Sequence, residues 1–266
     1  MADRTVYYAN KLSDVLYQMQ TVSGLRVVGG CTADPPPDRF LPALRIPELT
    51  EIERHERYID IGAAVTLDRL VSLGKTNIPE ILYEAAVSVG TSAVRNIATI
   101  GGNVCSSGAC AGTLTAPLLA LEARLELRRG AETRLIEFPQ FKSVPEGWIL
   151  TRIRVPREEW ALSLFKRTGP RARLSEESAS FAFLVAVQKD VVTSMRIAFS
   201  GPVSVRCRLI ENALYSTRLP LSREQVAGLM QQQRRQLDAE LSSAGVLPAV
   251  RQQLLNLAGF SLQQLM

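Results

Sequence analysis

The segment RNIATIGGNVCSSGACAG, from Arg95 to Gly112, constrains this chain more than any other. It is dense in Gly, Ser, Thr and Asn, whose small side chains let a backbone approach another group closely. A backbone that comes so close to another group is typical of ligand contact. We therefore expect the functional site of the chain at this segment.

A second glycine pair suggests what the ligand is. Gly29 and Gly30 follow the short apolar run Leu25–Val28, and Gly101-Gly102 similarly follows an apolar residue, Ile100, so we expect each pair to end a strand. Such turns point main-chain N–H groups at an anion with no Cβ in the way. Two of them could hold the two phosphates of one dinucleotide, and plain tight turns are the alternative interpretation.

Other phosphate-binding and catalytic motifs are incomplete. Gly74-Lys75-Thr76 lacks the glycine that a P-loop carries five positions earlier, where Arg69 stands. No GxGxxG occurs, which argues against a Rossmann site. The only histidine, His55, lies in the charged run EIERHERY, so we expect neither a Ser-His-Asp triad nor any other histidine base.

The cysteines do not indicate a metal site. None of the four forms a CxxC pair. Cys105 and Cys110 have the spacing that begins a plant-type iron–sulfur motif, but its third ligand position is occupied by Thr113. We therefore predict no bound metal.

Composition excludes several classes of protein. No run approaches the roughly 20 apolar residues of a membrane helix, and the N-terminus lacks the order of a signal peptide. We therefore expect a cytoplasmic protein that does not bind membranes. The net charge of +5 is spread along the chain, and few aromatic residues accompany its basic clusters, so no nucleic-acid binding is expected.

Periodicity predicts the order of the elements. A helix at Asp14–Met19 leads into the strand that ends at Val28, and the proline-rich TADPPPDRF follows as a stiff loop. Further along, EILYEAAVSV reads as a helix and PLLALEARLELRR as a helix turning into a strand. Beyond Glu146 we expect antiparallel strands with a hairpin at Lys189-Asp190, then two helices separated near 245–248.

The string RNIATIGGN, followed by PLLALEARLEL, resembles the FAD-binding medium subunit of molybdenum hydroxylases, the family of xanthine dehydrogenase and carbon monoxide dehydrogenase. The likeness runs nearly end to end. Val27–Gly30 matches the family's first pyrophosphate loop, and LRIPEL matches the strand and turn that follow it. FKRTGPRAR and GPVSVRCRLIENAL resemble parts of its C-terminal flavoprotein domain.

The resemblance implies an α+β fold: a two-lobed FAD-binding fold of the p-cresol methylhydroxylase/vanillyl-alcohol oxidase type, plus a C-terminal domain of antiparallel sheet and helices. The implied bounds are residues 1–55 and 56–160 for the two lobes and 161–266 for the C-terminal domain. The implied function is that of an oxidoreductase subunit whose FAD passes electrons from the [2Fe-2S] clusters of a small subunit to NAD or another acceptor. A molybdopterin-binding large subunit would oxidise the substrate, so activity is expected only with these partners.

The resemblance also implies a set of cofactor-binding residues and no catalytic residue. Main-chain N–H groups of the first loop would bind one phosphate, and the second segment would bind the other with help from an asparagine amide. An apolar residue and a lysine would lie near the flavin ring, where a positive charge favours the reduced, anionic form. The implied residues are Val28, Gly29, Gly30, Cys31, Thr32, Thr99, Ile100, Gly101, Gly102, Asn103, Ile149 and Lys166.

The chain departs from the family pattern at the site itself. Cys31 stands at a threonine position, and Gly112 replaces an aspartate that bonds FAD. Losing that charge-assisted hydrogen bond costs roughly 1.5 to 3 kcal/mol unless Ser107 or Thr113 compensates. A flavin-free scaffold subunit is therefore the alternative function. An unrelated flavoenzyme, such as the reductase of peptidoglycan precursor synthesis, would need a catalytic acid that the sequence does not reveal.

Overall fold

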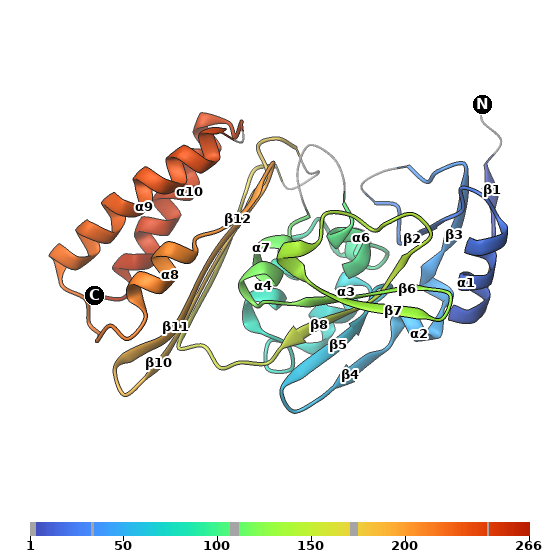
Figure 1. Cartoon of the computed structure of the whole chain (residues 1–266), viewed down its shortest axis with the longest axis horizontal. Coiled ribbons are helices and arrows are strands. Elements are labelled where there is room, and N and C mark those ends of the chain that lie inside the picture. Colours follow the sequence, from blue (N-terminus) through green and yellow to red (C-terminus); the bar gives the residue numbers. More distant parts are fainter. Residues whose placement is uncertain (1–3, 33–34, 107–111, 171–174, 244) are drawn as a thin grey trace. The chain divides into compact units, whose positions relative to one another are not determined.

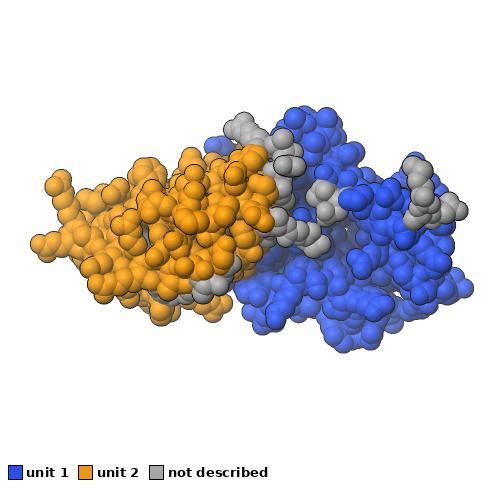
Figure 2. All heavy atoms as spheres, turned by 90° about the horizontal axis from the view of Figure 1, so that it is seen from above, with its two compact units in different colours: residues 1–79, 89–106, 122–157 blue, residues 80–88, 107–121, 158–266 orange. Residues whose placement is uncertain are grey.

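The structure, a computed structural model, describes residues 4–32, 35–106, 112–170, 175–243 and 245–266 (Figure 1). The chain forms two compact units, each assembled from several segments (Figure 2). Unit 1 comprises Met1–Pro79, Val89–Ser106 and Glu122–Arg157, and unit 2 comprises Glu80–Ser88, Ser107–Leu121 and Glu158–Met266. No helix within the described ranges is long and apolar enough to cross a membrane.

Unit 1 begins with a small parallel sheet in the order β1-β3-β2. Helix α1 (Leu12–Thr21) adds Leu12 and Val15 to the core beside this sheet. The predicted helix and strand are confirmed, and the first glycine pair does follow a strand. The strands are β1 (Thr5–Val6), β2 (Arg26–Val28) and β3 (Arg39–Pro42).

The segment LRIPEL is not the expected strand and turn. It forms the 3-10 turn η1 (Ala43–Arg45) and the one-turn helix α2 (Pro47–Thr50). Pro47 stands at the first helical position, where its fixed φ suits a helix and its missing N–H costs nothing. The Glu48 carboxylate then accepts a hydrogen bond of 3.0 Å from the N–H of Leu12, which ties α2 to the start of α1.

A five-stranded antiparallel sheet forms the rest of the unit 1 framework, in the order β4-β5-β8-β6-β7. Alternate side chains such as Ile59, Ile61, Ile153 and Val155 are fully buried on one face. The strands are β4 (Ile52–Arg54), β5 (Tyr58–Gly62), β6 (Arg124–Arg129), β7 (Glu132–Glu137) and β8 (Ile149–Pro156). The short helices of unit 1 are α3 (Leu67–Leu73), α5 (Ser92–Arg95), α6 (Ile100–Val104) and η2 (Phe138–Gln140).

The opposite face of this sheet carries a buried carboxylate. The side chain of Asp60 is 1% exposed and accepts two hydrogen bonds of 2.8 Å from Arg154 and one of 3.3 Å from Arg152. Burial alone would raise the pKa of Asp60, but the hydrogen bonds and positive charges of the two arginines outweigh burial and lower the pKa.

This lowered pKa makes the stability of the fold depend on pH. A carboxylate whose pKa is lower in the folded state stabilises the fold above its ordinary pKa of about 4, and that contribution is lost as the pH falls. We expect Asp60→Asn to lose about 2 to 3 kcal/mol of unfolding free energy at pH 7 and much less at pH 3, as measured by urea unfolding. The control, Asp38→Asn at an exposed position just before β3, should change neither value. An equal loss from Asp60→Asn at both pH values would contradict the prediction.

Unit 2 is built on a four-stranded antiparallel sheet in the order β12-β11-β10-β9. Helices α4 (Glu80–Ser88) and α7 (Thr115–Ala120) pack on the sheet, and so do α8 (Arg208–Leu214) and α10 (Pro248–Gln263), with α9 (Arg223–Ser243) against α10. The strands are β9 (Leu162–Thr168), β10 (Ala179–Gln188), β11 (Val191–Ser200) and β12 (Ser204–Arg206). Helices α8, α9 and α10 cover the same face of this sheet (Figure 1).

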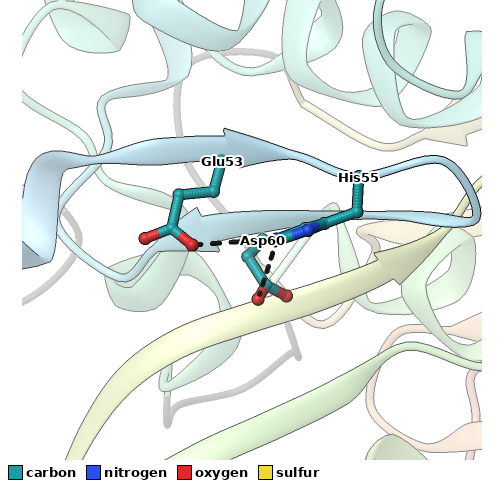
Figure 3. A group of neighbouring side chains, drawn as sticks. All are labelled: Glu53, His55 and Asp60. Carbon is teal, nitrogen blue, oxygen red and sulfur yellow. Dashed lines mark ion pairs between the residues drawn. The ribbon is translucent and has the colours of Figure 1, made fainter.

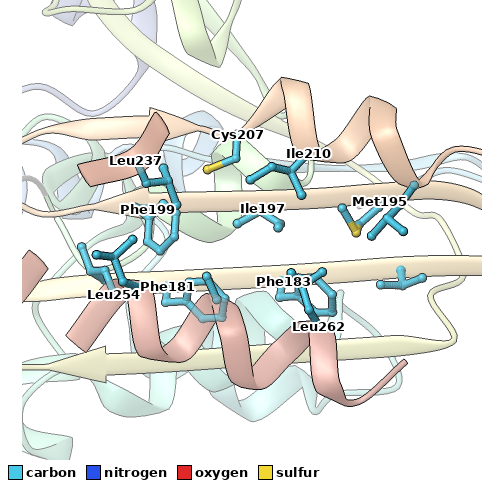
Figure 4. Packing of buried hydrophobic residues seen from close by; sticks show 14 of the residues in the cluster. Phe181, Phe183, Met195, Ile197, Phe199, Cys207, Ile210, Leu237, Leu254 and Leu262 are labelled. Carbon is cyan, nitrogen blue, oxygen red and sulfur yellow. The ribbon is translucent and has the colours of Figure 1, made fainter. Parts of the chain in front are cut away.

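The core of unit 2 lies between this sheet and those three helices (Figure 4). Phe181, Phe183 and Phe199 from β10 and β11 are fully buried there. The hairpin between these strands turns at Lys189 and Asp190, whose φ angles of 50° and 62° fit the type of turn that matches strand twist. The predicted hairpin and the predicted C-terminal helix pair are both confirmed.

Candidate functional site

The two glycine-rich segments identified in the sequence lie against each other in unit 1. The first segment contains Gly29 and Gly30, and the second contains Gly101 and Gly102. A Cβ atom added to Gly30 would overlap the carbonyl oxygen of Ile97, and one added to Gly29 would overlap the hydroxyl of Thr99. Neither glycine has a positive φ. Both are therefore required for close approach between the segments and not for a left-handed backbone.

The first segment presents main-chain N–H groups at its surface. No described residue accepts a hydrogen bond from the N–H of Gly30, Cys31 or Thr32. Cys31 adopts a left-handed φ of 49°, and both Cys31 and Thr32 are exposed. Successive unpaired N–H groups in such a bend form a concave anion site, so this donor set fits the phosphate oxygens of a dinucleotide.

The chemistry of Cys31 is compatible with an anion at this loop. Desolvation raises the pKa of its thiol, so the sulfur is uncharged at pH 7. A thiolate here would repel a phosphate, whereas a neutral thiol does not. The substitution at the family's threonine position therefore adds no opposing charge.

The second segment does not have the predicted form. Gly101 and Gly102 do not end a strand but lie in helix α6, and the hydroxyl of Thr99 caps this helix. The four N–H groups at its start all donate within the chain, so they are not free to hold a phosphate. These bonds run from Ile100 to Val65 O at 2.9 Å, from Gly101 to Ala63 O at 2.8 Å, from Gly102 to Thr99 Oγ1 at 3.0 Å and from Asn103 to Thr99 O at 3.0 Å.

Close packing explains the glycine at position 101 of this helix. A Cβ added to Gly101 would lie 2.6 Å from the carbonyl oxygen of Ala63. The segment around Thr99 pairs with Thr66 in a β-bridge, and the N–H of Leu67 donates to the Ala98 carbonyl at 2.8 Å. The second segment is therefore held firmly in place beside the first loop, and its residue Asn103 is half-buried.

Sequence reasoning missed two residues of this arrangement. The Arg95 guanidinium donates to the carbonyls of Val89 and Gly90 at 3.2 and 3.3 Å. These bonds hold the turn that precedes the second segment in place. Ile97 is 47% exposed although its backbone touches Gly30. An isoleucine within a run of small polar residues was the signal that could have identified it.

The remaining predicted residues belong to other segments of the chain. Ile149 is only 5% exposed and packs in the core of unit 1 against α1 and β3 residues. Thr113, 2% exposed, and Lys166 both belong to unit 2. Ser107 lies outside the described residues. Gly112, at the family's aspartate position, is buried, and its carbonyl accepts a bond of 3.0 Å from the N–H of Thr115.

Lys166 borders an open pocket of unit 2. It is exposed on β9, while its neighbour Phe165 is 6% exposed in the core. The pocket has a volume of about 310 Å³ and is lined by Glu84, Ser88, Phe165, Lys166, Arg167 and Gly169. No described carboxylate forms an ion pair with Lys166, so its charge is available to an anionic group.

Three residues of the types that bind metal ions, Glu53, His55 and Asp60, also lie together in unit 1, on the sheet face that carries Asp60 (Figure 3). His55 Nε2 lies 3.7 Å from Glu53 Oε2 and 3.8 Å from Asp60 Oδ2. However, Arg152 pairs with both carboxylates, at 3.0 and 3.3 Å. A divalent cation would face two guanidinium groups here, so we interpret the group as an ion-pair network.

Comparisons with known proteins agree with the resemblance in the sequence. A family model described as the FAD binding domain in molybdopterin dehydrogenase matches residues 2–158. The chain is 25% identical over 173 residues to the glyceraldehyde dehydrogenase medium chain of Sulfolobus acidocaldarius, across 62% of this chain and 60% of that one. It is 24% identical over 207 residues to the xanthine dehydrogenase FAD-binding subunit of Escherichia coli O157:H7, across 69% and 68%.

Solved structures share the fold. Carbon monoxide dehydrogenase from Hydrogenophaga pseudoflava matches with a TM-score of 0.79 and 20% identity, over 98% of this chain and 95% of that one. Quinoline 2-oxidoreductase from Pseudomonas putida 86 matches with a TM-score of 0.77 and 18% identity, over 97% and 98%. The fold is thus the mixed α/β fold of these chains. Since the family match spans more than half of the sequence, the chain belongs to the family of FAD-binding domains of molybdopterin dehydrogenases, whose cofactor is FAD.

Proposed function

We propose that this chain is the FAD-carrying electron-transfer subunit of a molybdenum hydroxylase-type oxidoreductase. It passes electrons between iron–sulfur clusters of a partner subunit and NAD or another acceptor. The observation that carries the proposal is the run of unpaired N–H groups at Gly30–Thr32, packed against the RNIATIGGN segment.

The two segments have different tasks in this proposal. Bound FAD supplies reversible one- and two-electron chemistry. The N–H groups of Gly30, Cys31 and Thr32 hold phosphate oxygens, and the left-handed turn at Cys31 directs them to one point. The wall formed by Thr99–Asn103 limits how the cofactor lies and offers the Asn103 side chain.

Further residues complete the proposed site. Lys166 places a positive charge near the flavin ring and so favours its reduced, anionic form. Thr113 and Ser107 substitute for the aspartate that Gly112 lacks, and Ile149 supports the ring side of the site from the core. Both FAD-binding lobes, residues 1–55 and 56–160, form the two-lobed fold of the p-cresol methylhydroxylase/vanillyl-alcohol oxidase type, with 161–266 as the C-terminal domain.

The names of the relatives support the proposal that this chain is one subunit of a larger complex. A medium chain and an FAD-binding subunit are each one part of a larger dehydrogenase. We propose that this chain likewise assembles with a molybdopterin-binding large subunit and a small subunit carrying two [2Fe-2S] clusters. Substrate oxidation takes place on the large subunit, which explains why this chain needs no catalytic acid or base of its own.

The first test is the visible absorbance spectrum of the purified chain, before and after incubation with FAD and removal of unbound cofactor. We expect the two flavin absorption bands at one FAD per chain. These bands should bleach when reduced partner subunits are added under nitrogen. A colourless protein in both preparations would contradict the proposal and favour the flavin-free scaffold, which the family match makes the weaker alternative.

A further inference from the structure

The segment at the end of strand β5, residues 62–65, contacts helix α6 through its carbonyl groups. The Ala63 carbonyl accepts a hydrogen bond from the N–H of Gly101, and the Val65 carbonyl accepts one from the N–H of Ile100. All four residues of the segment are buried, and none of them is among the cofactor-binding residues that the sequence predicts. The segment therefore takes part in the candidate site only through its contact with α6.

Three main-chain hydrogen bonds hold this segment from its other side. They connect it to strand β8, to α2 and to the residue after α2. The bonds run from Gly62 to Glu51 O at 2.8 Å, from Ala63 to Thr151 O at 2.9 Å and from Ala64 to Leu49 O at 2.8 Å. A Cβ added to Gly62 would overlap the Leu49 carbonyl oxygen, so this side has no free space either. Segment 62–65 is therefore a fixed support for α6, because it cannot move without breaking buried hydrogen bonds.

The side chain of Ala63 sets the distance between this segment and α6. A Cβ added to Gly101 would lie 2.8 Å from the Ala63 Cβ and 2.6 Å from the Ala63 carbonyl oxygen, so Ala63 packs directly on the Gly101 backbone. Ala63 is only 8% exposed. An interior packed this closely has no space for an added methyl group, so a larger residue at position 63 pushes α6 away.

A displacement of α6 also reaches the first loop. Thr99, the N-terminal cap of α6, packs on Gly29 of that loop. The unpaired N–H groups follow at Gly30–Thr32, while Asn103 lies on α6 itself. The position of α6 therefore sets the separation between the two parts of the proposed FAD site.

We propose that Ala63 is a positioning residue of the FAD site. Its methyl group and carbonyl oxygen hold α6 at the distance at which Asn103 and the N–H groups of the first loop reach one cofactor molecule together. Ala63 acts through Gly101 and not by contact with the cofactor. The inference rests on the proposed FAD function, and it adds to that function a residue outside both glycine-rich segments.

The test compares the FAD affinity of the full-length wild type and three variants by flavin fluorescence, with Tm recorded for each. Ala63→Val adds two methyl groups on a stiff, branched side chain that cannot turn both of them away from α6. Ala63→Ser, the conservative variant, adds one atom that can choose among three rotamers. Ala123→Val makes the same change as Ala63→Val at a fully buried alanine of unit 1. Its neighbour Arg124 pairs with Arg154, about 10 Å along β8 from Thr151.

We expect Ala63→Val to bind FAD at least roughly tenfold more weakly than the wild type, because overpacking displaces α6. Ala63→Ser should bind FAD like the wild type. Ala123→Val should also keep wild-type affinity, although its Tm falls as much as that of Ala63→Val.

Wild-type affinity in Ala63→Val would overturn the proposal. An equal loss of affinity in Ala123→Val would also overturn it, since lower stability would then be the cause. If Ala63→Val does not fold, Gly101→Ala makes the same overlap from the side of α6 and should show the same loss, and retained affinity in that variant overturns the proposal. A wild-type chain that binds no FAD contradicts the proposed function itself, and the positioning role then fails with it.

Discussion

Gly30→Ala is expected to weaken FAD binding by roughly a hundredfold, which corresponds to about 2.7 kcal/mol. The added methyl group overlaps the Ile97 carbonyl, so the first loop must move away from the second segment. Overpacking of this kind typically costs 1 to 3 kcal/mol, and here the shift also turns the N–H groups of Cys31 and Thr32 away from their common point. The measurement is FAD affinity by flavin fluorescence, with Tm recorded in parallel.

Gly228→Ala is the matched control, since it makes the same chemical change where a Cβ meets nothing. We expect it to bind FAD like the wild type and to gain about 0.5 to 1 kcal/mol of stability from better helix propensity. If Gly30→Ala keeps wild-type affinity, the first loop is not the phosphate site. If both variants lose FAD, the effect of Gly30→Ala is not specific to the loop.

Glu211→Ala is expected to destabilise unit 2 by about 3 to 5 kcal/mol. The Glu211 side chain is 5% exposed and the Arg206 side chain 9%, and their nitrogen and oxygen atoms lie 2.9 to 3.0 Å apart. The same carboxylate accepts a bond of 2.8 Å from the N–H of Ile197 on β11. Truncation therefore removes the carboxylate that pairs with the nearly buried Arg206 guanidinium, and it removes the acceptor of the buried Ile197 N–H. We expect Tm to fall by roughly 10 °C.

Two further variants keep this prediction testable even if Glu211→Ala fails to fold. The double variant Arg206→Met/Glu211→Leu removes both charges, so it should recover most of the lost stability. Glu132→Ala breaks exposed ion pairs with Arg129 and Arg134 and should change stability far less. Equal losses from Glu211→Ala and Glu132→Ala would show that burial does not set the strength of these pairs.

Local patterns in the sequence were sufficient for much of the fold. The helix over EILYEAAVSV, the hairpin at Lys189-Asp190 and the helix-to-strand change after Thr115 follow from periodicity and turn chemistry, and the structure confirms them. The proximity of Gly29 to the Thr99 segment was also foreseeable, because each glycine pair was interpreted as part of one phosphate site.

Features that depend on distant contacts could not be predicted. Helix α6 forms because Ala63 and Val65 supply carbonyls to Ile100 and Gly101, and nothing within RNIATIGGN reveals that partnership. The Asp60 network likewise requires β5 to pair with β8, whose arginines lie more than 90 residues along the chain. A single sequence shows which residues are small or charged but not the register that brings them together.

The interleaved segments of the two units have a consequence for how the chain is made. Helices α4 and α7 leave the ribosome well before β10 and β11, the strands on which α7 packs. All six residues of α7 are buried in the finished unit, so during synthesis the face of this apolar turn that packs on β10 and β11 stays uncovered until those strands emerge. Unit 2 therefore cannot fold vectorially, and the nascent chain passes through a stage that is prone to aggregation until the hairpin emerges.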